Sequence, residues 1–364
     1  MVRKLLKKSL WLLMALVAYL VYTIAFAMPQ TVESIYSQTV YPFLTQIWAT
    51  ITNLVPFSLG EVLLYLFAIA LIFLIFYILA GILKPKGTKL YHICSRFLTL
   101  LIVVASIYTL FIFNWGLNYA RQPLSQIMGV TVQDSSVEEL TEVCQKLIAT
   151  TNDLRGQVEE DENGVFILTD GKTSILERTS QIYEECAPEY MNAGASVNVK
   201  GILTPNLLSS IRTTGIYSPF TFECNINMQM PDAFFPCTAA HEYSHLKGFA
   251  REDEANFIAW YVTRNSSDVE FAYSGNLLAL THAMNALYDV SPELHAKLSA
   301  TICDGIHRDW QANNAYWDEF ETEFAENANA VYDSFLQYNG ISDGRKSYGR
   351  MLDLILALNR DDLL

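Results

Sequence analysis

Three long apolar runs near the start of the chain constrain its fold more than any other feature of the sequence. They extend over residues 10–27, 62–83 and 97–115, and each is long enough for a helix that crosses a hydrocarbon core about 30 Å thick. Backbone N–H and C=O groups inside a bilayer must be satisfied within the segment itself, which restricts such a run to a helix. The sequence therefore predicts three transmembrane helices in a lipid bilayer.

The distribution of Lys and Arg predicts how these helices are oriented. Basic residues precede the first run and lie around the link between the second and third runs, whereas residues 28–60 contain neither Lys nor Arg. Because cytoplasmic loops are enriched in basic residues, we expect a multi-pass protein with a cytoplasmic N-terminus. Residues 116–364 then lie outside the cytoplasmic membrane. The basic residues are Arg3, Lys4, Lys7, Lys8, Lys84, Lys86, Lys89 and Arg96.

The end of the first run allows two interpretations. Ala25-Phe26-Ala27 has the A-x-A pattern of a signal-peptidase site. The apolar run is long for a signal peptide, so we expect an uncleaved anchor, with cleavage after Ala27 as the alternative. Both interpretations give the same topology.

Charge divides at the same boundary. Residues 1–115 hold eight Lys and Arg against two Asp and Glu, a net charge of +6, so the rest of a chain with a total of −14 carries −20. An acidic exterior argues against nucleic acid as a partner. We expect a membrane anchor over residues 1–115 and one exterior domain over residues 116–364.

The exterior domain is expected to be mostly helical with a small sheet. A capping-box pattern at Ser135 to Glu138 predicts a helix that extends to about Gln157. Alternating apolar residues predict short strands over 196–203 and 222–230. The second of these is expected to form a sheet edge that could pair with an extended peptide, although a strand without a ligand is an equal alternative. Further helices are expected over 173–185, 276–288, 292–303, 310–338 and 348–358, and a short strand over 165–168.

The strongest chemical signal is His241-Glu242-Tyr243-Ser244-His245, an HExxH sequence. Residues four apart on a helix share a face, so the two imidazoles can bind one zinc ion while Glu242 acts as the general base of a metallohydrolase. Pro236 suits the first turn of this helix, and Gly248 lies where a left-handed cap would end it.

Two carboxylates are candidates for the third ligand. Glu252 shares a helical face with Asn256, so Glu252 would bind zinc while the Asn256 amide orients a ligating histidine. Glu254 is the alternative, although it points away from that face. A solvated acidic first turn, favoured there by the helix dipole, would explain these acids without any metal.

Tyr217 is a weak candidate for a hydroxyl that stabilises the oxyanion, with core packing as the alternative. Cys224 and Cys237 flank the segment that leads into the HExxH helix. They are expected either to form a disulfide or to be small buried side chains.

These motifs resemble the bacterial membrane family DUF3810. The resemblance rests on Trp115 to Arg121, Tyr217 to Thr221, the long segment His241 to Phe257, Tyr273-Ser274-Gly275 and Ser347 to Arg350. It implies an α+β protein of the bacterial cytoplasmic membrane, with three transmembrane helices and a zincin-like extracytoplasmic domain. The Glu252-x-x-x-Asn256 element is also similar to that of gluzincin peptidases, which implies Glu252 as a zinc ligand.

Two function classes follow. The first is a membrane-anchored, zinc-dependent metallopeptidase that hydrolyses peptide or related amide bonds outside the cytoplasmic membrane. The alternative is a non-catalytic membrane protein whose zincin-like domain binds a partner or an envelope component. Glu242 favours catalysis, because a structural zinc site needs no base beside it.

Overall fold

The three apolar runs form three long helices. The computed structural model describes residues 1–361, and within them three helical segments are long and apolar enough to cross a membrane, Val2–Ala25, Leu59–Leu79 and Gly87–Asn114. We call these the candidate spans. The first combines α1 (Val2–Ser9), a 3-10 turn (Leu10–Leu12) and α2 (Leu13–Ala25), and the others are α5 (Leu59–Leu79) and most of α6 (Lys86–Asn114). The three predicted spans are confirmed as helices of this kind, with shifted ends.

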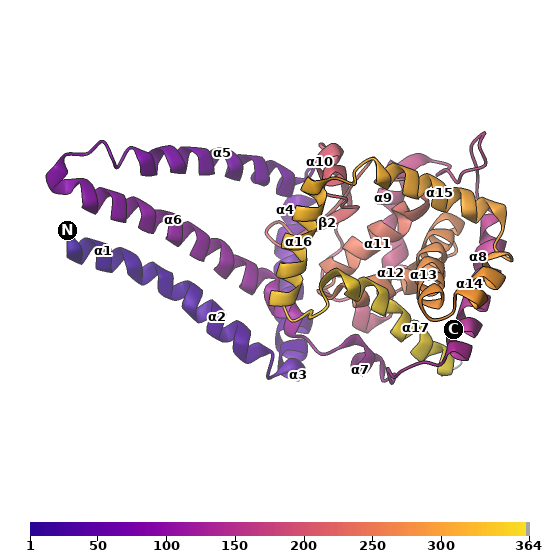
Figure 1. Cartoon of the computed structure of the whole chain (residues 1–364). Helices are drawn as coiled ribbons and strands as arrows, with labels where there is room; N and C mark the ends of the chain where they lie inside the picture. Colours follow the sequence, from indigo (N-terminus) through magenta and orange to yellow (C-terminus); the bar gives the residue numbers. More distant parts are fainter. Residues whose placement is uncertain (362–364) are drawn as a thin grey trace.

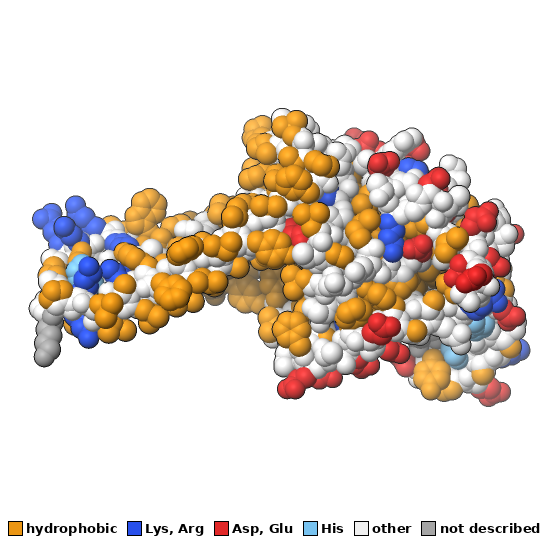
Figure 2. Space-filling model, turned by 90° about the horizontal axis from the view of Figure 1, so that it is seen from above, with side chains coloured by type: hydrophobic (Ala, Val, Ile, Leu, Met, Phe, Trp, Pro, Cys, Tyr) orange, Lys and Arg blue, Asp and Glu red, His pale blue; other side chains and the backbone are white. Residues whose placement is uncertain are grey.

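The candidate spans extend together from one end of the helical domain (Figure 1). Helices α5 and α6 form a hairpin whose link lies at the far end, near the N-terminus. Figure 2 shows Lys and Arg side chains gathered at that far end and acidic side chains spread over the domain. The charge division of the sequence is therefore also a division in space.

The segment between the first two spans belongs to the domain. It folds as α3 (Pro29–Thr31), a π-helix (Val32–Val40) and α4 (Tyr41–Thr52). Arg121 donates two hydrogen bonds to Glu33, at 2.8 and 2.6 Å, and Ser37 Oγ donates to Asn118 Oδ1 at 2.9 Å. A domain boundary at residue 115 is therefore too simple, because residues 29–52 pack into the same core as the chain that follows residue 115.

Helices dominate the domain, as expected. Helix α8 begins with the predicted capping box, formed one residue later than expected by Ser136 and Glu139. The α-helices after the third span are α7 (Leu124–Met128), α8 (Val137–Arg155), α9 (Gly171–Cys186), α10 (Pro205–Ser210), α11 (Phe235–Leu246), α12 (Glu252–Arg264), α13 (Val269–Val290), α14 (Pro292–Ser299), α15 (Asp304–Asp318), α16 (Glu323–Tyr338) and α17 (Met351–Arg360). Short 3-10 segments cover Gly116–Ala120, Glu189–Met191, Asp232–Phe234 and Gly344–Arg350.

The sheet in the described part of the chain has the strand order β1-β3-β2. The central strand β3 (Glu223–Ile226) is buried along its length, parallel to β1 (Lys200–Gly201) and antiparallel to β2 (Gly215–Ser218). The prediction that residues 222–230 form a sheet edge is wrong, because β3 lies between β1 and β2. Strands β1 and β2 are the two edges, and the four residues of β2 are too few to show a clear alternation in the sequence.

Two further strand predictions are only partly met. The extended piece at 196–203 contributes the two residues of β1. The predicted strand at 165–168 is reduced to an isolated bridge between Glu160 and Phe166. Gly164 lies in the turn between them in a left-handed conformation, with φ of +72°.

A buried ion pair connects the sheet to the second candidate span. Lys200 Nζ lies 2.6 Å from Glu223 Oε1, and both side chains are almost fully buried. Glu223 also accepts hydrogen bonds from the backbone N–H groups of Leu59 and Gly60 at the start of α5, at 3.0 and 2.7 Å. An anionic carboxylate at the N-terminus of a helix is favourable, so this contact fixes α5 to the sheet.

Candidate metal centre

Helix α11 carries the HExxH residues and ends where the sequence predicts. Pro236 lies in its first turn, and Gly248 has a φ of +87° just after its end. The N–H of Phe249 donates to the carbonyl of Ser244 at 3.2 Å, which completes a Schellman-type cap. Because the chain reverses at Gly248, helix α12 starts at Glu252 directly against α11.

The reversal brings three ligating atoms together. Oε2 of Glu252 lies 3.2 Å from Nε2 of His241 and 3.3 Å from Nε2 of His245. The candidate ligand atoms of these three residues all lie within 4.8 Å of one another.

These distances suit a zinc ion. Zinc bound to nitrogen and oxygen at a tetrahedral angle would separate neighbouring ligand atoms by about 3.4 Å, close to the spacing found. Glu252 Oε2 is buried, and the Nε2 atoms of His241 and His245 are its near neighbours, an arrangement that leaves room for a cation between the three atoms. Two imidazoles and one carboxylate are a typical donor set for catalytic zinc.

The alternative carboxylate, Glu254, lies elsewhere. Its Oε1 accepts hydrogen bonds from the N–H of Leu124 at 2.8 Å and from Arg251 Nη1 at 2.9 Å. The structure therefore groups Glu252, and not Glu254, with the histidines.

The histidine-orienting role expected of Asn256 falls to another group. Asn256 Nδ2 donates to the carbonyl of Tyr348 at 3.3 Å, whereas Nδ1 of His245 lies 2.7 Å from the carbonyl of Phe249. The backbone that turns after Gly248 thus orients His245. Nδ1 of His241 is buried and has no hydrogen-bond partner in the described chain.

Two tyrosines near Glu252 were not predicted as site residues. Tyr332 on α16 donates to Glu252 Oε1 at 2.5 Å. Tyr348 packs with its ring nearly parallel to that of His241, at 6.3 Å between centroids, and burial together with the nearby Glu252 carboxylate raises its pKa. The Ser347 to Arg350 segment that supports the family resemblance was the available signal for Tyr348. Tyr332 had none.

The electrostatics of the cluster favour a bound cation. Burial alone would raise the pKa of Glu252, but the two histidines lower it well below its usual range. Burial lowers the pKa of His245, and the Glu252 carboxylate outweighs this effect and raises it to about 9. Positive charge beside the buried Glu252 carboxylate is thus favourable, and a metal cation can supply that charge.

The Glu242 side chain lies against the edge strand β2. Burial raises its pKa, and the charges of the histidines and the N–H of Tyr217 reduce that effect. A Cβ on Gly215 would lie 2.7 Å from both Cγ and Oε1 of Glu242, so the strand approaches the carboxylate closely. Its Oε2 is buried and has no hydrogen-bond partner among residues 1–361, which leaves one oxygen available for a reacting proton.

The Tyr217 side chain has packing contacts. Its hydroxyl is 2.9 Å from that of Tyr41, and its ring packs 4.7 Å from that of Trp115. These contacts match the core-packing interpretation of Tyr217.

The six cysteines all lie in the described chain and are free thiols. The predicted bridge between Cys224 and Cys237 is therefore absent from this structure, and the alternative of small buried side chains holds. Cys224 Sγ donates to the carbonyl of Glu242 at 3.2 Å. Burial raises the pKa of both thiols, which makes them poor nucleophiles.

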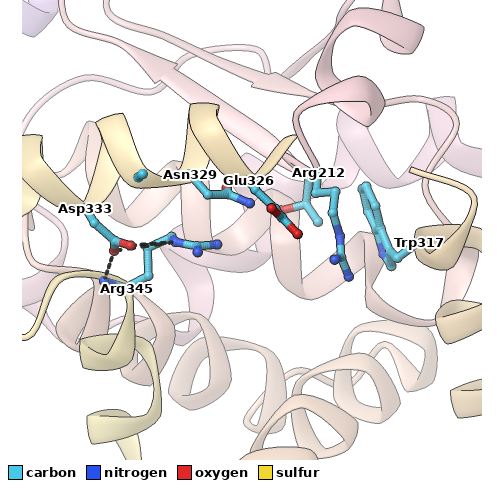
Figure 3. Close-up of a pocket in the computed structure, with 8 residues that line it drawn as sticks. Arg212, Trp317, Glu326, Asn329, Asp333 and Arg345 are labelled. Atoms are coloured by element: carbon cyan, nitrogen blue, oxygen red, sulfur yellow. Dashed lines mark hydrogen bonds and ion pairs between the residues drawn. The ribbon is translucent and has the colours of Figure 1, made fainter. Parts of the chain in front are cut away.

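A cavity of about 590 Å³ adjoins the edge strand. It lies between α16, the same helix that carries Tyr332, and the chain that leads into β2 (Figure 3). Asp333 is paired with Arg345, while Arg212 extends beside Trp317. The residues that line the cavity are Arg212, Thr214, Trp317, Glu326, Asn329, Ala330, Asp333 and Arg345.

Comparison with known proteins identifies a family but no characterised relative. No curated protein and no solved structure gives a significant match to the chain. The sequence model of DUF3810, described as a protein of unknown function, matches residues 36–356, which include α4, the sheet, α11, α12 and Tyr348. The chain belongs to the DUF3810 family.

Proposed function

We propose that this protein is a membrane-anchored, zinc-dependent metallopeptidase that hydrolyses peptide or related amide bonds outside the cytoplasmic membrane. The observation that carries the proposal is the convergence of His241, His245 and Glu252, with the unpaired carboxylate oxygen of Glu242 one position along the same helix. A structural zinc site would need the ligands but not this base.

In this proposal His241, His245 and Glu252 hold the zinc ion. When bound, zinc supplies Lewis acidity that activates water and polarises the scissile carbonyl. Glu242 accepts the proton of the attacking water at its unpaired oxygen and delivers it to the leaving amine. Its raised pKa suits both transfers, because burial makes the carboxylate a stronger base than an exposed glutamate.

The edge strand supports a polypeptide substrate. The N–H of Asn227 donates to the carbonyl of Thr214, so the alternation of an antiparallel pair directs the backbone groups of Gly215 and Tyr217 away from β3. An extended peptide could pair with these groups beside Glu242. The cavity that begins at Thr214 would then receive substrate residues beyond one end of the strand.

The proposed orientation places the N-terminus in the cytoplasm and the metal centre outside. The basic ends of the candidate spans, opposite the acidic domain, support it (Figure 2). An uncleaved first span is supported by the hydrogen bond from Tyr22 to Asn339 on the domain, at 2.6 Å, because cleavage after Ala27 would remove that contact.

The test uses the full-length protein in lipid nanodiscs. We expect about one zinc ion per chain by elemental analysis, and cleavage of a peptide library measured by mass spectrometry. Glu242→Gln should abolish cleavage and retain zinc, while Glu293→Gln, at an exposed position on α14, should change neither. Stoichiometric zinc without cleavage of any library member would favour the non-catalytic binding function instead. Failure to bind zinc under metal-replete conditions would contradict the proposed zinc site and therefore the peptidase proposal.

A further inference from the structure

The outer face of α4 is an apolar stripe. Phe43, Ile47, Ile51 and Leu54, in α4 and just after it, are 65, 46, 48 and 81% exposed. Their spacing of four, four and three residues places them on one face of a helix that continues through its last turn. We call these four side chains the α4 stripe.

The opposite face of α4 is fixed to the domain. Tyr41, Thr45, Ala49 and Thr52 are buried at the same helical spacing. The backbone N–H of Ala195 donates to Thr45 Oγ1 at 3.1 Å, and Lys200 donates to the carbonyl of Thr52 at 2.7 Å. The helix is therefore amphipathic with its packed side already occupied, and rotation cannot hide the α4 stripe.

The surroundings of the stripe favour lipid over water. Residues 28–60 contain one charged side chain, Glu33, and Arg121 pairs with it. In Figure 1, α4 runs across the ends of the candidate spans, and Figure 2 shows apolar side chains gathered at that end of the domain. On the face of the domain seen in Figure 2, acidic side chains are scattered among other polar, basic and apolar ones. An exposed patch of this kind marks an interaction site.

The chain itself places the patch at the bilayer surface. Three residues separate α2 from α3, and six separate α4 from α5, so both ends of the segment are tethered to helices that are candidate spans. Six extended residues reach about 20 Å at most. The whole segment is thus held near the surface where the first span ends and the second begins.

We propose that α4 lies in the plane of the membrane interface, with the α4 stripe inserted between the lipid headgroups and the first acyl carbons. Its partner is the lipid bilayer. The length and amphipathicity of α4 suit this position, because interfacial helices bury an apolar face about 5–10 Å deep while the other face stays in a polar environment. The inference depends on the candidate spans crossing the bilayer and not on peptidase activity.

This position bears directly on the metal centre. Tyr41, on the packed face of α4, lies 3.0 Å from the carbonyl of Leu246 and 3.4 Å from that of His245. One side chain therefore separates the interfacial helix from the end of α11. The candidate metal centre is held next to the membrane surface.

The experiment measures the depth of labelled side chains in the full-length protein. Single cysteines at Ile47 and Ile51 would carry the fluorophore NBD, in a protein whose Cys94, Cys186 and Cys303 are changed to serine. Nanodiscs would contain phosphatidylcholine with brominated acyl chains, which quench NBD at short range. Val104→Cys in the third span and Val290→Cys at the end of α13 are reference positions with similar exposure, 55 and 57%.

We expect the labels at Ile47 and Ile51 to be quenched almost as strongly as the label at Val104, and the label at Val290 to be unaffected. Quenching no stronger than at Val290 would overturn the proposal. So would rapid disulfide formation between Ile47→Cys chains in nanodiscs that hold two copies, combined with weak lipid quenching, because the stripe would then contact a second copy of this chain.

Discussion

The hydroxyl groups of Tyr41 and Tyr217 lie 2.9 Å apart, where the helix between the first two candidate spans meets the edge strand beside Glu242. Tyr41 also donates to the carbonyl of Leu246 at the end of α11. One buried hydroxyl thus joins the interfacial helix, the sheet edge and the helix that carries both histidines.

Removal of this hydroxyl should destabilise the domain. Tyr41→Phe leaves a buried hydroxyl and a buried carbonyl without their partner, a loss of about 1–3 kcal/mol in the free energy of unfolding. Denaturant unfolding in nanodiscs measures it. Tyr288→Phe, at an exposed position on α13, is the matched control and should be neutral. Equal stability of the two variants would show that the contact contributes nothing.

Exchange of each acid for its amide separates the two ligand candidates. Glu252→Gln should leave the protein unable to retain zinc during dialysis, because it removes the anionic oxygen between the two histidines. Glu254→Gln should retain zinc, because its partners are Leu124 and Arg251. Elemental analysis of both variants decides the assignment. Retention of zinc by the first and loss by the second would reverse it.

Tyr332 should tune the affinity for metal. Its hydroxyl orients Glu252, and loss of such a partner typically lowers metal affinity about 10–100-fold, which we expect for Tyr332→Phe. Competition with a zinc-binding fluorescent chelator gives the Kd. Tyr338→Phe on the same helix removes an exposed hydroxyl bond to Tyr108 and should leave the Kd unchanged. If both variants bind zinc equally well, Tyr332 has no role in metal binding.

Gly215→Ala should impair turnover without loss of zinc. The added Cβ would overlap the Glu242 carboxylate, and displacement of a catalytic group by about 1 Å can reduce the rate about 100-fold. Gly349→Ala has open space around its Cβ and provides the control. The prediction concerns kcat in the peptide assay at constant zinc content. An unchanged kcat for Gly215→Ala would contradict the close approach of strand and base.

The buried ion pair of Arg155 and Asp309, which lies away from the metal centre, should contribute strongly to the free energy of unfolding. Arg155 Nε donates to Asp309 Oδ2 at 2.8 Å, and Asp309 also accepts from the N–H of Phe166. Asp309→Asn should destabilise the domain by about 3 kcal/mol, because the buried Arg155 guanidinium loses its buried counter-charge and keeps only the half-exposed Glu160, at 3.2 Å. The exposed pair of Lys146 and Glu142 is the comparison, and Glu142→Gln should cost less than about 1 kcal/mol. Similar losses for both would indicate that burial of the pair is unimportant.

The sequence alone predicted those features that arise from neighbouring residues. The spacing of His241 and His245 and the turn at Gly248 are contained in eight consecutive residues, so helix periodicity and cap chemistry were sufficient. They left the choice between Glu252 and Glu254 open, and the resemblance to gluzincins favoured Glu252. The spans follow from apolar length in the same way.

Other parts of the site depend on contacts between distant residues. Tyr332 is 80 positions from Glu252, and Tyr41 is 205 positions from Leu246. No local pattern records such pairs. The edge position of β2 was missed for the same reason, because it depends on which strand covers β3 and not on the four residues of β2 themselves.

The contacts of residues 29–52 with the domain also impose an order on assembly. Two candidate spans, α5 and α6, separate these residues from the rest of the core. If either helix failed to insert, the two parts would face opposite sides of the membrane, and Tyr41 could never reach Leu246. In the proposed topology, α5 and α6 must therefore both be inserted before Tyr41 can contact the end of α11. A chain inserted with the wrong topology could not close this core, so only a correctly inserted chain can complete the fold.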